Sequence, residues 1–265
     1  MKRTTYIIIG LFVLGLLLIP VLLRTPAGEK VARRLSMEGE RTEIEMAGIR
    51  HVKIVEKLGK IDKDGIGIAG QLDVQASPAL GKSIFAYPKS KYLNVTQEGD
   101  CLLIEVDMDN EGLSQIVQSL DKGRILILDG LNLELKADFT LLSIENRAVR
   151  VDINIKKLCL DSLFLFNEEW QDISLDSCCF RSLDIKGKRL SLKADQVKVT
   201  DYYEEFSIRS SEISGFSVDN LYLSGKDSHR YRTGINCKRI FWNPLAEDAE
   251  LELTLRQKGE IILNH

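Results

Sequence analysis

The chain has 265 residues, of which 44% are hydrophobic and 28% charged, a balance that is ordinary for a folded protein. The net charge of -3 argues against a nucleic-acid partner, because nucleic-acid-binding proteins carry a basic surplus. The five cysteines are too few and too scattered for a disulfide framework, so we interpret them as buried small apolar side chains.

The first predicted element is an apolar segment, residues 4–23, that carries no charge. A bilayer core of roughly 30 Å needs about 20 helical residues, so this segment predicts a single transmembrane helix within residues 1–24. We expect an uncleaved signal-anchor, with a signal peptide cut after Ala27 as the alternative. Lys2 and Arg3 are typical of an export signal and predict that most of the chain is periplasmic or on the cell surface.

A basic tether, residues 25–40, follows the apolar segment. It places positive charge on the second side of the predicted membrane helix, so the two sides are nearly balanced in Lys and Arg. A cytoplasmic domain held by a membrane tether is therefore an alternative to the extracytoplasmic arrangement.

Residues 41–265 show apolar alternation with a period of two, as in Leu102 to Val106 and Leu251 to Leu255. This period is typical of strands with one buried face, and it predicts an all-β domain. Residues 112–120 are the exception and predict one short helix. The last two strand patterns flank residues 257–259, which predicts a C-terminal capping hairpin.

Triplets of the form apolar-x-apolar recur through the second half of the chain. Successive triplets begin about 16 residues apart, at Leu126, Leu142, Leu158, Ile173, Leu190, Phe206, Leu221 and Ile235. A fixed period is typical of repeat folds, so we predict short strands stacked as a β-solenoid (β-helix). A meander of antiparallel hairpins is the alternative, because alternation also recurs there.

Three segments resemble the opening strands of the head GIN domain family of autotransporter-type adhesins. They are residues 47–54, 72–78 and 92–104, and the similarity continues over residues 44–218, about two thirds of the chain. The resemblance implies a β-helical fold, a cell-envelope location and an adhesin-like role. It implies no catalytic residues.

Two motifs suggest ligand chemistry and lack the context that it needs. Gly65, Gly67 and Gly70 spell a dinucleotide fingerprint, but a strand pattern follows where a helix is required, so we assign them to a bend or bulge. Residues 107–112 resemble the start of a calcium loop, yet Gln118 stands where a bidentate Glu belongs. We predict no metal, no cofactor and no catalytic residue.

The middle residue of each triplet is expected to face outward, in one flat row of small polar side chains. The row comprises Ile127, Ser143, Cys159, Ser174, Ser191, Ser207, Tyr222 and Asn236. A flat row suits a glycan or an envelope protein, and we take Ser174, Ser191, Ser207 and Tyr222 as candidate binding residues. Tyr202 and Tyr203, in an aromatic and acidic loop, are further candidates. A solvated hydroxyl ladder is the alternative.

These patterns favour a membrane-anchored envelope protein that binds or scaffolds without catalysis. A carbohydrate-active enzyme is the alternative, because β-helical enzymes use paired acids on an outer face. The acids spaced by nearly one repeat are Asp161 with Asp176 and Asp184 with Asp201.

Overall fold

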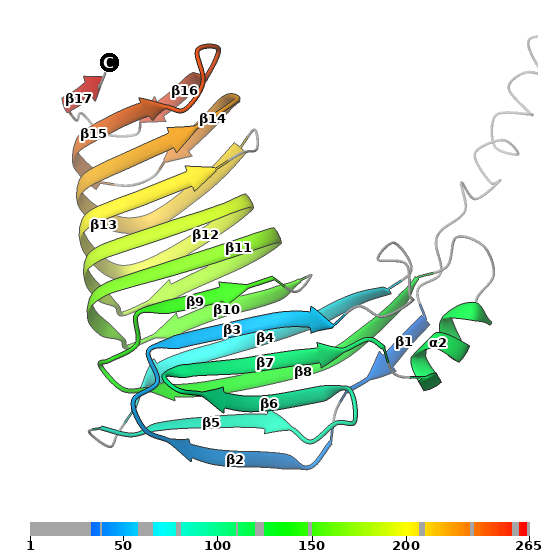
Figure 1. The fold of residues 1–265 in the computed structure, drawn as a ribbon. Coiled ribbons are helices and arrows are strands. Elements are labelled where there is room, and N and C mark those ends of the chain that lie inside the picture. Colours follow the sequence, from blue (N-terminus) through cyan, green and yellow to red (C-terminus); the bar gives the residue numbers. More distant parts are fainter. Residues whose placement is uncertain are drawn as a thin grey trace, which may run out of the picture.

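The computed structural model describes residues 33–37, 39–57, 66–77, 81–109, 111–119, 125–147, 150–206, 210–233, 236–255 and 260–263. Within these ranges 17 strands join into one hydrogen-bonded sheet (Figure 1). A short helix, α2 (Glu111–Gln118), confirms the helix predicted at this place.

The first ten strands run in both directions. They are β1 (Arg33–Ser36), β2 (Arg41–Met46), β3 (His51–Lys57), β4 (Ile66–Ala76), β5 (Ser83–Pro88), β6 (Leu93–Glu98), β7 (Cys101–Asp107), β8 (Leu126–Ala137), β9 (Ser143–Asn146) and β10 (Val151–Lys156). Strand β5 pairs antiparallel with β2 and β8, and β6 pairs antiparallel with β7. Strand β3 lies parallel to both β7 and β9, and β4 lies parallel to both β8 and β10.

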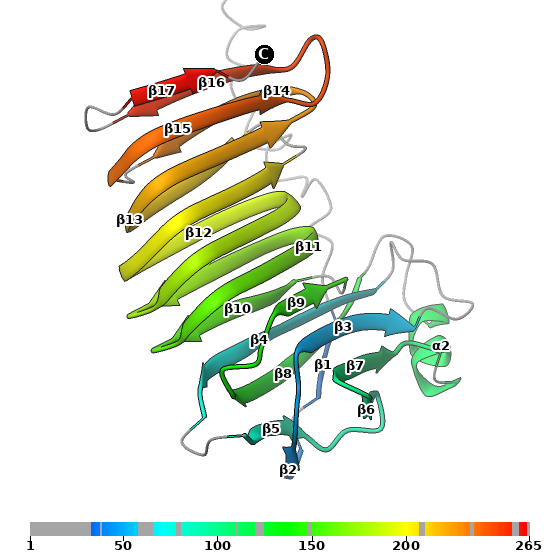
Figure 2. The same cartoon turned by 60° about the vertical axis from the view of Figure 1, so that its left-hand side comes forward.

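The remaining strands pair in parallel and include the longest of the sheet. They are β11 (Cys159–Asp176), β12 (Cys179–Phe206), β13 (Ser210–Gly225), β14 (Ser228–Thr233), β15 (Asn236–Pro244), β16 (Glu250–Leu255) and β17 (Glu260–Leu263). Strands β11, β12 and β13 each bend, so that one strand contributes to two faces of the sheet (Figure 2). We call one passage of the chain around the core, from the front face over the back face and to the front face again, a winding. Cys159 lies opposite Cys179, an offset of 20 residues per winding, and Val197 lies opposite Phe216, an offset of 19.

The sheet therefore folds over into two faces around a shared core. The front face, seen in Figure 1, follows β3 and β9 through residues 159–167, 179–187, 197–206 and 216–225 to β15. The back face follows β8, β4 and β10 through residues 170–176, 189–195 and 210–214 to β14 and β16. Strand β16 pairs with β14, and β17 pairs with β15.

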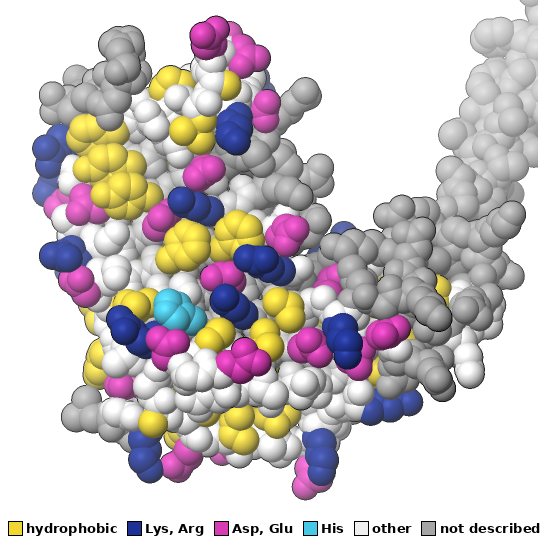
Figure 3. Space-filling view, viewed as in Figure 1, with side chains coloured by type: hydrophobic (Ala, Val, Ile, Leu, Met, Phe, Trp, Pro, Cys, Tyr) yellow, Lys and Arg dark blue, Asp and Glu magenta, His cyan; other side chains and the backbone are white. Residues whose placement is uncertain are grey.

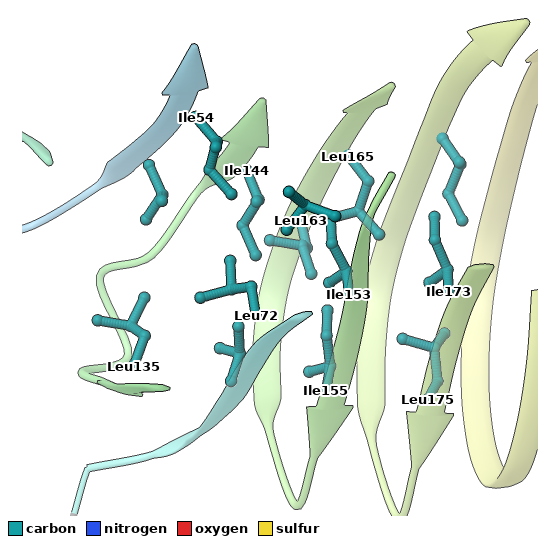
Figure 4. Close-up of a cluster of buried hydrophobic side chains, with 14 of the residues drawn as sticks. Ile54, Leu72, Leu135, Ile144, Ile153, Ile155, Leu163, Leu165, Ile173 and Leu175 are labelled. Carbon is teal, nitrogen blue, oxygen red and sulfur yellow. The ribbon is translucent and has the colours of Figure 1, made fainter. Parts of the chain in front are cut away.

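Alternate side chains of the two faces meet in the core (Figure 4). Ile144, Leu163 and Leu165 enter it from the front face, and Ile153, Ile155, Ile173 and Leu175 enter it from the back face. Each of these side chains is at most 1% exposed. Burial of apolar surface contributes roughly 25 cal/mol per Å², so this continuous core is the main source of stability.

The bends from the back face to the front face share a backbone conformation. Lys157, Ser177 and Gln196 stand at three successive bends, and each has a positive φ, of 52°, 55° and 52°. The Lys157 N–H donates to the carbonyl of Asp176, and the Ser177 N–H donates to that of Asp195, both at 2.9 Å. Backbone hydrogen bonds between windings thus hold the bends in the left-handed region, which disfavours residues other than Gly.

Two glycines allow close approach between neighbouring strands. A Cβ atom at Gly70 would lie 2.5 Å from the carbonyl oxygen of Leu131, and one at Gly187 would lie 2.6 Å from that of Asn167. The register between β4 and β8 shifts between Ile68 and Gly70, which confirms the bulge predicted for this glycine-rich segment.

The structure confirms the all-β class and corrects the predicted stack of short strands. The predicted β-solenoid (β-helix) is wrong, because one mixed sheet with antiparallel pairs folds into a nearly closed wall around the core. Its strands reach 28 residues, in β12. The 16-residue period is also wrong, since some successive triplets, such as those at Leu158 and Ile173, lie on opposite faces, and the offset between neighbouring strands of one face is 19 to 22 residues.

The predicted transmembrane segment, residues 4–23, lies outside the described residues. Within the part of the chain that the structure describes, no helix combines the length and apolar character needed to span a bilayer.

Candidate functional site

Three aromatic rings stack on the outside of the front face. Tyr203 of β12 lies opposite Tyr222 of β13, which lies opposite Phe241 of β15. The ring centroids are 4.5 and 4.6 Å apart, and the planes differ by 7° and 10°. We call Tyr203, Tyr222 and Phe241 the aromatic row; hydrophobic side chains gather in a strip over these strands in Figure 3.

The row follows from parallel pairing in register. Side chains of a strand alternate between the two sides of a sheet, so residues that lie opposite each other in parallel strands point the same way. Leu221 and Leu223 flank Tyr222 in sequence and are buried, which leaves the Tyr222 ring outside. Offset stacking of such rings is worth about 0.5–1.5 kcal/mol per pair beyond their burial.

An acid takes the next place in the row. Cys179 lies opposite Cys159, and its N–H donates to the carbonyl of Leu158. The Lys198 N–H donates in the same way to the carbonyl of Cys178. Lys198 therefore lies opposite Cys179. The same register puts Tyr203 opposite Asp184, and Asp184 lies opposite Phe164. The column therefore reads Phe164, Asp184, Tyr203, Tyr222, Phe241.

Polar side chains run along both sides of this column. Asp201 and Asn220 lie opposite each other on one side, where the Asn220 amide donates to Asp201 Oδ1 at 2.7 Å. On the other side, Lys186 Nζ lies 3.5 Å from a carboxylate oxygen of Glu205. The same ammonium group lies over the Phe164 ring, 5.8 Å from its centroid.

A hollow of about 330 Å³ opens beside the aromatic row. Its lining includes Asp184, Lys186, Tyr203, Glu205, Tyr222 and Asn243. Tyr203 is 38% exposed, which makes it one of the more exposed large hydrophobic residues of the described chain. The hollow thus combines apolar ring edges, carboxylates and one ammonium group on an otherwise flat surface.

Burial changes the ionisation of two groups in the hollow. Burial raises the pKa of the Asp184 carboxyl, Lys186 opposes this shift, and Glu205 adds to it. Asp184 Oδ1 is enclosed and accepts no hydrogen bond from any residue that the structure describes. Burial also raises the pKa of the Tyr203 hydroxyl, with further contributions from Asp201, Tyr222 and Asp184.

The structure separates the two tyrosines that the sequence placed in one loop. Tyr203 belongs to the aromatic row, whereas Tyr202 is 0% exposed and lies in the core. The Tyr202 hydroxyl donates to Glu204 Oε2 at 2.9 Å. Burial first, and then the adjacent Glu204 carboxylate, raise the pKa of Tyr202 well above its ordinary value.

The predicted outer row of polar residues does not exist as one row. Tyr222 lies on the front face, while Ser174 and Ser191 lie on the back face and are not opposite each other. Ser207 lies outside the described residues. Whether these residues bind a ligand stays a prediction, but of the predicted set only Tyr203 and Tyr222 lie directly opposite each other in the described chain.

The acid pairs considered for an enzyme are not brought together. Asp161 is on the front face, where it pairs with Arg181, and Asp176 is on the back face. Asp184 lies opposite Phe164, while Asp201 is hydrogen-bonded to Asn220 in the neighbouring column.

Two of the five cysteines form a disulfide. Cys159 is bonded to Cys179, whereas Cys101, Cys178 and Cys237 are free. The interpretation of all five as packed apolar side chains is therefore wrong for this pair. A structural disulfide is typical of an extracytoplasmic compartment.

Sequence reasoning missed the aromatic row as a unit. The signal was available, because Tyr203, Tyr222 and Phe241 follow one another at intervals of 19 residues. That interval equals the offset between windings in this part of the sheet. A 16-residue period cannot align them.

No protein-family model matches the chain, and no curated protein matches it significantly. Among solved structures, it resembles a putative lipid-binding protein from Parabacteroides distasonis, with 12% identity, a TM-score of 0.44, and coverage of 88% of this chain and 100% of that one. It also resembles a putative adhesin from Bacteroides fragilis, with 11% identity, a TM-score of 0.39, and coverage of 87% and 100%. At these values the likeness carries no argument about function, and the head GIN resemblance stays a prediction.

Proposed function

We propose that the protein is a non-enzymatic, adhesin-like binding module of the cell envelope, and that the aromatic row with its hollow is the binding surface. The observation that carries the proposal is the stack of Tyr203, Tyr222 and Phe241 on the open front face. Aromatic side chains supply large contact area at low cost in conformational entropy, which is why binding surfaces use them.

The surroundings of the row support binding to a polar, extended ligand. Hydrogen-bonding side chains lie on both sides of it, with Asp201 and Asn220 on one side and Glu205 and Asn243 on the other. An apolar centre with polar margins is the usual composition of a recognition surface. The rings are also held in place by their neighbours, so little ordering is required when a ligand binds.

The first test is retention of the full chain, in nonionic detergent, on insoluble polysaccharides and peptidoglycan sacculi. We expect the wild type to co-sediment with at least one of them, and the variant Tyr203→Ala/Tyr222→Ala to lose about tenfold or more in affinity. Phe139→Ala is the matched control, because Phe139 is 57% exposed and is not among the residues of the row or hollow.

Unchanged retention of the double variant would overturn the assignment of the surface. The bound polymer is also examined for chain length after incubation. Shortened polymer would contradict the non-enzymatic role and favour a carbohydrate-active enzyme instead.

We further propose that residues 4–23 hold the protein in the membrane and that the sheet lies outside the cytoplasm. The apolar run supports the anchor, and the Cys159–Cys179 disulfide supports the location. The test follows protease digestion of the protein, detected by a tag after His265, in intact cells, in cells with a breached outer envelope, and in lysed cells. We expect digestion once the outer envelope is breached while the inner membrane is still sealed. Protection until the inner membrane is lysed would place the domain in the cytoplasm.

A further inference from the structure

We propose that the place of Asp184 in the column is a receptor slot for an amino sugar of a linear glycan. This inference rests on the proposed function and names the ligand class of the same surface. The column is aromatic on both sides of Asp184, with Phe164 before it and Tyr203 after it. One ring is therefore missing from the stack, and a carboxylate stands at the floor of the gap.

The gap has the dimensions of one inserted group. Neighbouring strands lie about 4.8 Å apart, so rings two strands apart leave room for one further layer between them. Tyr222 covers one face of Tyr203, and the other face is turned toward Asp184 and the hollow. A sugar ring in the gap would place its apolar face against the free face of Tyr203.

The chemistry of the gap favours a ligand that donates hydrogen bonds and carries positive charge. Asp184 is half-buried and belongs to the lining of the hollow, so its carboxylate can accept a hydrogen bond from a donor of the ligand. Two acids whose side chains face outward, Asp184 and Glu205, and one base, Lys186, belong to the lining. An ammonium group gains both from this excess of carboxylates and from the face of an aromatic ring.

The protein already places one of its own cations in this gap. Lys186 Nζ lies over the Phe164 ring and pairs with Glu205. This ammonium group therefore occupies the side of the gap next to Phe164. The Tyr203 side is the part that opens to the hollow. The contacts of Lys186 thus match those that an ammonium group of the ligand would make, and the hollow next to Asp184 would hold that group.

A glycan fits the margins of the site better than a basic peptide. A pyranose ring has an apolar face and a rim of hydroxyl groups, and the column has an apolar centre between two polar columns. Asp201 and Asn220 on one side, and Glu205 and Asn243 on the other, can bond to such a rim. A second sugar would lie along Tyr203, Tyr222 and Phe241.

The test compares three hexasaccharides with the same β-1,4 backbone, by calorimetric titration of the full chain in nonionic detergent. They carry an ammonium group, an acetamido group or a hydroxyl at carbon 2. We expect the glucosamine hexamer to bind about tenfold more tightly than the glucose hexamer, with the acetylated hexamer between them. Asp184→Asn should remove this preference, and Tyr203→Ala should weaken all three.

Asp195→Asn is the matched control, because Asp195 is an exposed acid at the end of a back-face segment, and we expect it to leave the three affinities unchanged. Equal affinities for the three hexamers, or no effect of Asp184→Asn, would overturn the amino-sugar slot and leave the aromatic row as the binding surface. Binding of hexalysine as tightly as the glucosamine hexamer would overturn it in favour of a basic peptide. Co-sedimentation with insoluble polymers tests the proposed function separately, because it does not depend on these hexamers. Loss of co-sedimentation would mean that the proposed function fails, whereas co-sedimentation without a preference among the hexamers would mean that only the amino-sugar slot fails.

Discussion

The hydroxyl of Tyr202 donates a 2.9 Å hydrogen bond to the carboxylate of Glu204, and both side chains are buried beneath the aromatic row. The next residue in sequence, Tyr203, lies on the opposite side of the same strand and belongs to the row. The buried pair therefore supports the segment of β12 that presents the binding surface.

Removing the hydroxyl should destabilise the fold. We expect Tyr202→Phe to lower the free energy of unfolding by about 1–3 kcal/mol, because a buried carboxylate loses a hydrogen-bond donor. Tyr202→Phe/Glu204→Leu should be more stable than the single variant, since both polar partners are then replaced by apolar groups. Urea denaturation measures both. Tyr87→Phe, at a half-buried tyrosine of β5, is the control; an equal loss there would contradict the role of the Tyr202 hydrogen bond.

The disulfide should contribute a measurable part of the stability. Cys159 and Cys179 are separated by 20 residues, and closing a loop of that length stabilises by about 3 kcal/mol in the chain-entropy description. We expect Cys159→Ser/Cys179→Ser to lose this amount and to become insensitive to reductant. Cys101→Ser, which removes a free thiol, should unfold like the wild type and keep the sensitivity. A double variant as stable as the wild type would show that the bond constrains little.

The bends offer a test of backbone strain. Gln196 is held at a φ of 52°, where a β-branched residue is strongly disfavoured. We expect Gln196→Val to cost about 1–2 kcal/mol in the free energy of unfolding, and Gln196→Gly to be neutral or stabilising. Thr200→Val, at an exposed strand position nearby, should change the stability by less than about 0.5 kcal/mol. Similar costs for Val at both positions would argue against strain at the bend.

Asp184 should make stability depend on pH in a defined direction. Burial raises its pKa in the folded protein, so the folded state binds a proton more readily than the unfolded state. Its destabilising contribution is therefore absent below the ordinary carboxyl pKa, develops as pH rises toward the raised pKa, and is complete above it. We expect Asp184→Asn to be more stable than the wild type at neutral pH and equally stable in acid. Parallel curves of stability against pH for the two proteins would contradict this.

Alternation predicted the inward side chains well and the connectivity poorly. Alternation assigns one inward pair to each of two segments, and all four side chains are buried: Leu163 with Leu165, and Leu183 with Ile185. Alternation is the same in parallel and antiparallel strands, however, so the antiparallel pairing of β5 and β6 left no trace in the sequence. The class of the fold could be predicted, and the pairing could not.

The period failed for a related reason. The triplets that begin at Leu158 and Ile173 both alternate, yet one lies on the front face and the other on the back face. The distance between them measures the path across one bend, not the offset between neighbouring strands. Tyr202 was misplaced because the inward positions shift between Val199 and Tyr202, so counting by twos across that segment gives the wrong side.

The position of the disulfide also determines how the sheet would respond to mechanical load. In the C-terminal half each winding is hydrogen-bonded to the windings next to it, so a pull on the C-terminal end would peel the strands away one after another, beginning with β17 and β16. When the peeling reaches Cys179, the covalent bond passes the tension directly to Cys159. Residues 160–178 then carry no tension until the bond itself is reduced, and the load passes from Cys159 to β10 and the strands before it.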